Sequence, residues 1–210
     1  MQSQPKNRPY ADAPRLPGEG KVNVRELTEK AGARFEIEIG PGRGGFMLER
    51  LALVPDLSMV GFEIRRKWAT IVDERLRKHG YGDRGRVFAE DARQALERLE
   101  PDGSVDVVYV HFPDPWWKKR HQKRLVMSPA LLDQVARLLR KGGELFVQTD
   151  VEERAEAYEA QVSAHPAFEP AGDEEGSARM TENPYSARSP REHRAIADGI
   201  PIVRLRFRKI

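Results

Sequence analysis

One short stretch of the chain combines an acid, two aromatic residues and a run of bases. In residues 112–124, FPDPWWKKRHQKR, Asp114 stands between two prolines, two tryptophans follow, and five of the next seven residues are lysine or arginine. The prolines restrict the backbone on both sides of Asp114 and hold its carboxylate at a fixed angle. Lysine and arginine bind phosphates, and an indole stacks on a nucleic-acid base for about 1 to 3 kcal/mol. The pattern predicts a reacting centre beside a nucleic-acid contact, against the alternative of a solvated loop.

Further acids stand where predicted strands end. Glu38 precedes a glycine turn, GPGRGG at 40–45, while Glu63 and Asp91 follow the next two apolar runs. The turn fits both G-x-G-x-x-G and G-x-G-x-G, in which bare backbone can approach a ligand. A carboxylate at Glu63 suits a ribose diol and one at Glu38 an ammonium group, while Asp91 suits either the amine of adenine or a helix N-cap. Together the acids favour S-adenosylmethionine, a cationic and ribose-bearing cofactor, over a nicotinamide dinucleotide.

A regular alternation of strands and helices must position these acids. Strands are expected at 35–39, 58–63, 86–90, 105–112, 144–149 and 202–207, and helices at 45–53, 64–79, 92–99, 128–140 and 152–164. Ser128 and Pro129 are typical of a helix start, and Gly142 with Gly143 is typical of a helix end. The alternation indicates a doubly wound α/β fold with a parallel sheet, which binds ligands at the carboxyl ends of its strands.

The ends of the chain depart from this rhythm. Residues 1–20 are rich in proline, glycine and charge and predict a flexible N-terminal arm, while residues 21–210 have the length of a single domain. Between 165 and 190 no clear period is present, and we expect loops around a short strand near Phe168.

Composition narrows the class of protein. The 210 residues include no cysteine, which excludes disulfides, Cys-ligated zinc and a thiol nucleophile. The five histidines show no ligand spacing, so no metal is expected. The sequence has neither a signal peptide nor an apolar run that spans a bilayer, and we expect a cytoplasmic protein without a membrane partner. The net charge is only +3, but bases gather at 117–124 and from Arg188 to Lys209 and predict one phosphate-binding face.

In their order along the chain, these motifs resemble the bacterial tRNA (guanine-N7-)-methyltransferases, a family of class I S-adenosylmethionine-dependent enzymes. The resemblance covers roughly residues 34–208 and rests on EIGPGRGG (38–45), GFEI (61–64), EDA (90–92), FPDPWWKKRHQKRL (112–125), QTD (148–150) and SPREHRAIADGIPI (189–202). It implies a doubly wound, mostly parallel, seven-stranded Rossmann-like methyltransferase sheet with an antiparallel C-terminal strand.

The resemblance also implies which residues bind and react. The methyl donor S-adenosylmethionine would contact Glu38, Gly40, Glu63, Asp91 and Asp114, of which Asp114 also belongs to the catalytic centre. The substrate, tRNA, would contact Lys118, Asp150, Ser189, Pro190, Arg191 and Glu192. Many family members have threonine at the position of Ser189, where serine keeps the hydroxyl, and Pro190 makes the local backbone harder to predict. The implied target is N7 of guanine 46 in the tRNA variable loop. No obligatory protein partner is inferred, and homo-oligomerisation stays open.

The chemistry of this target defines a hypothesis for Asp114. N7 of guanine has a lone pair and no proton, so its methylation requires no general base. Guanine offers donors at N1 and at its exocyclic amine, and a carboxylate is an acceptor, so Asp114 is expected to orient and select the base. Trp116 and Trp117 either stack on RNA or pack in the core. The competing hypotheses are methylation of another RNA base or a small molecule, a nicotinamide-dependent oxidoreductase, and a catalytically idle RNA-binding module.

Overall fold

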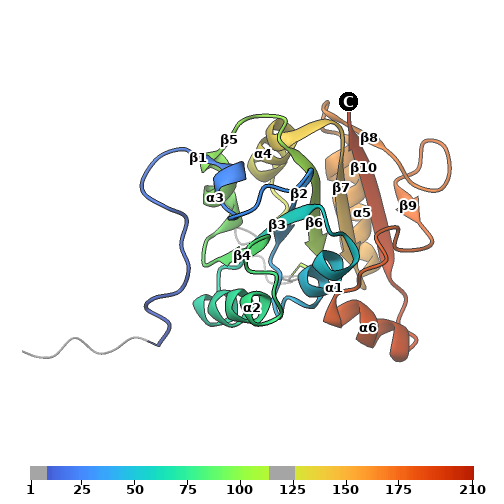
Figure 1. The fold of residues 1–210 in the computed structure, drawn as a ribbon. Coiled ribbons are helices and arrows are strands. Elements are labelled where there is room, and N and C mark those ends of the chain that lie inside the picture. The colour runs from blue at the N-terminus through green and yellow to red at the C-terminus, as the bar shows by residue number, and fades with distance from the viewer. Residues whose placement is uncertain (1–8, 114–125) are drawn as a thin grey trace, which may run out of the picture.

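The structure is a computed structural model that describes residues 9–113 and 126–210. Its centre is an eight-stranded sheet with the order β4-β3-β2-β6-β7-β10-β8, in which β9 pairs with β10 beside this path (Figure 1). The strands are β2 (Arg34–Ile39), β3 (Leu57–Phe62), β4 (Gly85–Phe88), β6 (Val105–His111), β7 (Leu139–Thr149), β8 (Phe168–Pro170), β9 (Arg179–Met180) and β10 (Val203–Lys209). A separate small sheet pairs β1 (Val22–Asn23) with β5 (Leu99–Glu100), and the 3-10 helix η1 (Val24–Glu26) follows β1.

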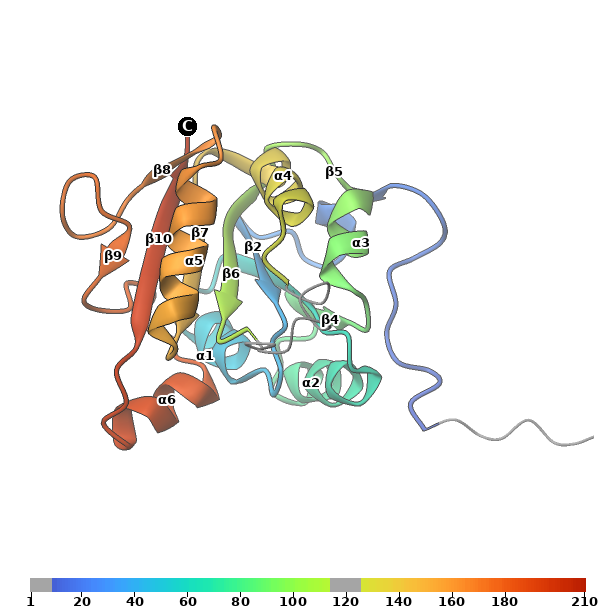
Figure 2. The same cartoon turned by 180° about the vertical axis from the view of Figure 1, so that it is seen from behind.

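Helices cover both faces of the central sheet. They are α1 (Gly45–Leu53), α2 (Arg66–Lys78), α3 (Ala92–Arg98), α4 (Pro129–Leu138), α5 (Glu152–Ser163) and α6 (Pro190–Ala197). One buried apolar cluster joins α1 and α2 to the sheet, and a second joins α3, α4 and α5 to the opposite face (Figures 1 and 2). None of the helices in the described residues has the length and apolar character needed to cross a membrane.

The strand directions confirm the predicted fold class. The strands β2, β3, β4, β6 and β7 are parallel, and β10 runs antiparallel to β7. The chain moves outward from β2 to β4 and then returns to β6 on the other side of β2. Strand order therefore reverses between β2 and β6, which is where an open α/β sheet forms its ligand crevice.

The predicted elements are largely present, with corrections around the glycine pair and in the C-terminal part. The helix expected at 45–53 has these bounds, and the short strand near Phe168 is β8. Gly142 and Gly143 do not end a helix, because α4 stops at Leu138 and both glycines lie inside β7, where Gly142 has a φ of 74°. The strand β9 and the helix α6 were missed in a region where we expected loops and a final strand.

Part of the expected N-terminal arm lies against the domain. Ala13 and Leu16 are buried, and the Pro14 carbonyl accepts a hydrogen bond of 2.6 Å from the Ala89 amide. Arg98 donates to the carbonyls of Pro17 and Gly18. Residues 13–18 therefore belong to the packed surface, and the domain boundary at residue 21 stays a prediction.

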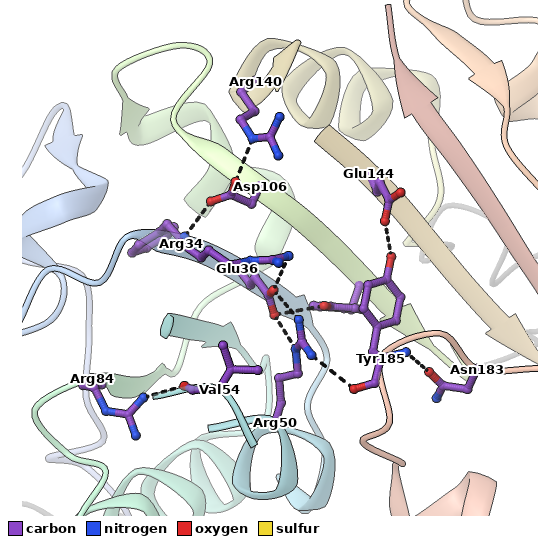
Figure 3. A network of polar contacts seen from close by, with 12 residues as sticks. Arg34, Glu36, Arg50, Val54, Arg84, Asp106, Arg140, Glu144, Asn183 and Tyr185 are labelled. Carbon is purple, nitrogen blue, oxygen red and sulfur yellow. Dashed lines mark hydrogen bonds and ion pairs between the residues drawn. The ribbon is translucent and has the colours of Figure 1, made fainter. Parts of the chain in front are cut away.

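A buried carboxylate connects the sheet to α1 and to the C-terminal segment (Figure 3). Glu36 on β2 is fully buried and accepts from Arg50 Nε at 3.0 Å, Arg50 Nη2 at 2.8 Å and the Tyr109 hydroxyl at 2.9 Å. Arg50 also donates to the Tyr185 carbonyl at 3.1 Å, and the Tyr185 hydroxyl donates to Glu144 on β7 at 2.7 Å. This network, which we call the Glu36 network, holds the chain that leads into α6.

The ionisation of the network follows from burial and from the charge of Glu36. Burial alone lowers the pKa of Arg50, but the hydrogen bonds with Glu36 and the negative charge of that carboxylate raise it above its ordinary value. Burial, followed by the negative charge of Glu36, raises the pKa of Tyr109. The arginine therefore stays charged and the tyrosine stays neutral, and the two together compensate the buried carboxylate.

We expect Arg50→Met to destabilise the protein by about 3 to 5 kcal/mol, because it removes the buried cation and leaves Glu36 only the partly exposed Arg34, whose Nη2 lies 3.1 Å from Oε1. The measurement is urea unfolding, with the exposed Arg66→Met as the control. The double variant Glu36→Gln/Arg50→Met should recover part of the loss. Equal free energies of unfolding for Arg50→Met and Arg66→Met would contradict a stabilising role for the network.

Candidate active site

A cleft opens at the carboxyl ends of the central strands. It consists of two cavities of about 600 and about 690 Å³. The first, which we call the α6-side cavity, includes residues 149–151 and the first residues of α6, and the second, the α3-side cavity, includes the ends of β3 and the start of α3. Both are lined by the same five residues, Gly40, Arg65, His111, Phe112 and Pro113, and together they form one continuous cleft.

The glycine turn between β2 and α1 needs glycine for its backbone shape. Gly40, Gly42 and Gly44 have φ values of 70°, 55° and 70°, which L side chains rarely adopt. A Cβ on Gly44 would lie 2.2 Å from the side chain of Val72, whereas one on Gly40 would meet nothing within 4 Å. Gly40 therefore leaves open backbone on the wall of the cleft, where a ligand can approach it.

Glu63 holds this turn and faces the α3-side cavity. Its side chain is 3% exposed, and Oε2 accepts from the Gly42 amide at 3.1 Å. Oε1 accepts from the amide and from Nε of Arg65, both at 3.0 Å, and the Arg65 side chain is 61% exposed. The predicted ribose-binding acid is thus fixed in place by the backbone of the turn.

Asp91 fulfils the capping role that the sequence left open beside a ligand role. It is the N-cap of α3 and accepts from the Arg93 amide at 3.0 Å. A hydrogen bond from the Arg93 side chain, together with the backbone bond, outweighs burial and lowers the pKa of Asp91. The residue also lines the α3-side cavity, so capping and exposure to the cleft occur together.

Glu38 and His111 form a buried pair at the ends of β2 and β6. His111 Nδ1 lies 2.9 Å from Glu38 Oε1, and the two side chains are 3% and 2% exposed. Within residues 9–113 and 126–210, neither Glu38 Oε2 nor His111 Nε2 has a hydrogen-bond partner. Leaving a buried polar atom unpaired costs about 1 to 3 kcal/mol, so such atoms beside a cleft point to a missing ligand or water. The sequence signal for His111 was its place at a strand end, directly before FPDP.

The described substrate candidates gather on the wall of the α6-side cavity, with one exception. Asp150 accepts from Arg191 Nε at 2.9 Å, and Ser189 is the N-cap of α6, where its hydroxyl accepts from the Glu192 amide at 3.1 Å. Pro190 is the first residue of α6 and also lines the cavity. Glu192 instead has its carboxylate inside the fold.

The buried Glu192 carboxylate is bonded entirely by its own C-terminal region. It accepts from Asn183 Nδ2 at 3.0 Å and from Arg204 Nη2 at 3.2 Å. These bonds connect α6 to β10 and to the segment before α6. Direct contact between Glu192 and a substrate stays a prediction. In this structure, the carboxylate of Glu192 holds α6 in place. Two other predicted residues, Asp114 and Lys118, lie outside the described residues.

The start of α6 is packed directly on the glycine turn. A Cβ added to Gly45 would lie 2.6 Å from Cγ and 2.8 Å from Cδ of Pro190. The glycine at the first position of α1 therefore makes room for the proline at the first position of α6. This contact brings the predicted substrate residues next to the predicted cofactor turn.

Four arginines line the α6-side cavity, and the sequence motifs singled out only one of them, Arg191. Arg43 and Arg65 come from the two loops that precede α1 and α2, and Arg191 and Arg194 come from α6. All four residues are exposed. Arg65 and Arg191 are paired with the acids Glu63 and Asp150, and the guanidinium of Arg43 lies 5.3 Å from the ring centre of Trp68. We call this set the arginine rim.

Comparison with known proteins adds a family. A family model described as "Putative methyltransferase" matches residues 33–205. The tRNA (guanine-N(7)-)-methyltransferase of Myxococcus xanthus is 34% identical over 175 residues, which are 83% of this chain and 83% of that protein. The tRNA (guanine-N(7)-)-methyltransferase of Anaeromyxobacter dehalogenans is 39% identical over 182 residues, which are 86% of this chain and 88% of that protein.

Solved structures show the same fold at low sequence identity. The 16S rRNA methyltransferase KamB has a TM-score of 0.60 and 14% identity, and the match covers 88% of this chain and 92% of that one. A geranyl diphosphate C-methyltransferase from Streptomyces coelicolor, solved with S-adenosyl-L-homocysteine, has a TM-score of 0.55 and 16% identity, over 89% of this chain and 77% of that one. The likeness supports a methyltransferase fold.

The contact between Gly45 and Pro190 predicts a coupled effect on stability. Gly45→Ala should destabilise the protein by about 1 to 3 kcal/mol, because the new methyl group overlaps the proline ring. At an unhindered helix position the same change would stabilise by roughly 0.5 to 1 kcal/mol. In a Pro190→Ala background the cost should shrink, and urea unfolding of the four variants measures the coupling. Equal effects of Gly45→Ala in both backgrounds would argue against the contact.

Proposed function

The chain belongs to the tRNA (guanine-N7-)-methyltransferase family, and from this premise we propose that it methylates N7 of guanine 46 in the variable loop of tRNA. It is a methyltransferase, and its methyl donor is S-adenosylmethionine. The observation that carries the proposal is the agreement between the relatives and the cleft: Glu38, Glu63 and Asp91 all line it. The nicotinamide alternative loses its basis, because these relatives are methyltransferases.

We assign the methyl donor to the continuous cleft, with its adenosine end in the α3-side cavity. The residues that line the cleft fit the methyl donor. Glu63 would accept from the ribose hydroxyls in competition with the exposed Arg65 side chain, and Asp91 would lie by the adenine amine. Gly40 offers open backbone, and the unpartnered Oε2 of Glu38 suits the ammonium group. Asp114, which lies outside the described residues, is the remaining predicted contact of the methyl donor. When bound, the donor supplies a sulfonium methyl group to the acceptor.

The protein's part in the reaction is orientation. Since N7 carries no proton, none of the cleft acids is needed as a general base. Holding N7 in line with the methyl group can lower the barrier by up to roughly 7 to 11 kcal/mol, and nearby carboxylates stabilise the positive charge that develops on the base. We assign to Asp114 the orientation of the base. The α6 side would support the same base through Asp150, Ser189, Pro190 and Arg191.

The tRNA would approach over the arginine rim and the bases of 118–124. Exposed arginines around a cleft attract phosphates. Each contact between an arginine and a phosphate releases counterions, so the affinity for tRNA depends on the salt concentration. Lys118, which lies outside the described residues, stays a predicted contact of the tRNA. A tRNA substrate also agrees with the expected cytoplasmic location.

Transfer of labelled methyl from S-adenosylmethionine to bulk tRNA, followed by mapping of the modified base, tests the function. We expect 7-methylguanine at position 46 and no labelling of a transcript in which this guanine is replaced by adenine. Asp114→Asn should lower the rate by roughly 100-fold or more while S-adenosylhomocysteine still binds, because an orienting acceptor is lost. Labelling of a different base would favour the alternative of another RNA methyltransferase.

The arginine rim predicts a loss of salt-dependent affinity. The double variant Arg43→Glu/Arg194→Glu should bind tRNA at least tenfold more weakly at low salt, and the slope of log Kd against log salt should fall by about 1 for each lost phosphate contact. The matched control is Lys78→Glu/Lys141→Glu, which changes the net charge by the same amount. Lys78 is an exposed base at the far end of α2, about 18 Å along the helix from its start, and Lys141 is an exposed base near the amino end of β7. Similar tRNA affinities for the rim variant and the control, in filter binding, would exclude the rim as a phosphate contact.

A further inference from the structure

Three polar side chains lie side by side on adjacent strands, and two of them, Glu38 and His111, line the α6-side cavity. Glu38 on β2 bonds to His111 on β6, and His111 is the register partner of Gln148 on β7. Register partners point to the same side of a sheet, so the three form one line, which we call the polar row. All three are buried, Gln148 completely.

The polar row is unsatisfied. Among the described residues, Glu38 Oε2, His111 Nε2 and both side-chain polar atoms of Gln148 are buried without a hydrogen-bond partner. The rings of Phe46 and Phe146 lie at centroid distances of 4.3 and 6.1 Å from His111, and they offer no hydrogen bonds. The groups that complete the row therefore lie outside the described residues of this chain, or they belong to a ligand or to water.

The neighbouring pair one step down the same strands shows what is lacking. Glu36 and Tyr109 repeat the geometry of Glu38 and His111, with a bond of 2.9 Å in each pair. Glu36 is neutralised by the Arg50 guanidinium, whereas no cation of the described chain is paired with Glu38 apart from its contact with His111. A ligand that brings a positive group into the α6-side cavity would supply the counterpart.

We propose that the polar row recognises the amino-acid end of S-adenosylmethionine, with His111 and Gln148 as determinants beside Glu38. This rests on the assignment of Glu38 under the proposed function. An ammonium group has three N–H donors, and the row presents three unpartnered acceptors, Glu38 Oε2, His111 Nε2 and Gln148 Oε1. The Gln148 amide nitrogen adds a donor that suits the carboxylate of the same ligand.

His111 has the role of a positioning residue for Glu38. The carboxylate opposite Nδ1 places the ring proton on that nitrogen, which leaves Nε2 as an acceptor in the neutral ring. The Nδ1–H bond fixes one oxygen of Glu38 and turns the other, Oε2, toward the ligand. A side chain with the same ring shape but without nitrogen would lose both effects.

Two ligands that differ only at the amino-acid end test the proposal. S-adenosylhomocysteine carries this end, and 5′-methylthioadenosine has the same adenosine and sulfur without it. By calorimetry, His111→Phe and Gln148→Leu should each weaken S-adenosylhomocysteine binding about tenfold or more and change 5′-methylthioadenosine binding less than twofold. His111→Asn, which keeps an N–H for Glu38, should bind S-adenosylhomocysteine more tightly than His111→Phe does. It replaces His111→Phe in the test if that variant does not fold. Tyr158→Phe, buried on the opposite face of the sheet, is the control.

Equal losses for both ligands, or unchanged S-adenosylhomocysteine binding in the His111 and Gln148 variants, would overturn the proposal. Glu38→Gln separates this failure from a failure of the donor assignment. If Glu38→Gln selectively weakens S-adenosylhomocysteine while the other two variants do not, only the role of His111 and Gln148 is wrong. If Glu38→Gln also has no effect, the assignment of Glu38 itself is wrong, whatever the outcome of the tRNA methylation assay.

Discussion

The charge on Glu36 constrains the whole arrangement, because a fully buried carboxylate must be compensated by groups that the fold brings to it. Two of the compensating groups come from distant parts of the chain, Arg50 from α1 and Tyr109 from β6, and a third, Arg34, comes from β2 itself. Arg50 then also binds the Tyr185 carbonyl, which places the segment leading into α6. A charge beneath the cleft thereby determines where the C-terminal part of the site can lie.

The same two strands carry a satisfied acid and an unsatisfied one. At Glu36 the protein supplies the cation, and the site is closed and stabilising. At Glu38, two residues further along β2, the described part of the chain supplies His111 on one side and leaves one oxygen unpaired beside the cleft. The alternation of side chains along a strand brings both acids to one face, so a structural acid and the acid that we assign to ligand binding stand only two residues apart on β2.

Much of the fold and part of the site were readable from local patterns. The strand-end acids and the glycine turn could be found because the carboxyl ends of parallel strands meet at one edge, and Glu38, Glu63 and Asp91 do line one cleft. The helix α6 was missed although Ser189 and Pro190 repeat the start signal of Ser128 and Pro129, since the region before it has no period.

Other features of the site depend on long-range contacts that no local pattern encodes. The burial of Glu192 follows from Asn183 and Arg204, which lie 9 and 12 residues away and on different elements. The polar character of Gln148 and His111 could be read in the sequence. Their lack of partners among the described residues could not, because it depends on which side chains the packed helices bring nearby. Sequence patterns locate the cleft, whereas the set of unsatisfied atoms that defines its ligand emerges only from packing.

The contact of α6 with the glycine turn has a consequence for a reaction that works by orientation. Pro190 fits where Gly45 lacks a side chain, so the wall that carries Ser189 and Arg191 is fixed against the turn that is assigned to the methyl donor. A rate that depends on the alignment of two reactants is sensitive to the relative position of the surfaces that hold them. Building those surfaces in direct contact, and fastening the segment before them to the buried Glu36 network, reduces that relative motion without any residue having to transfer a proton.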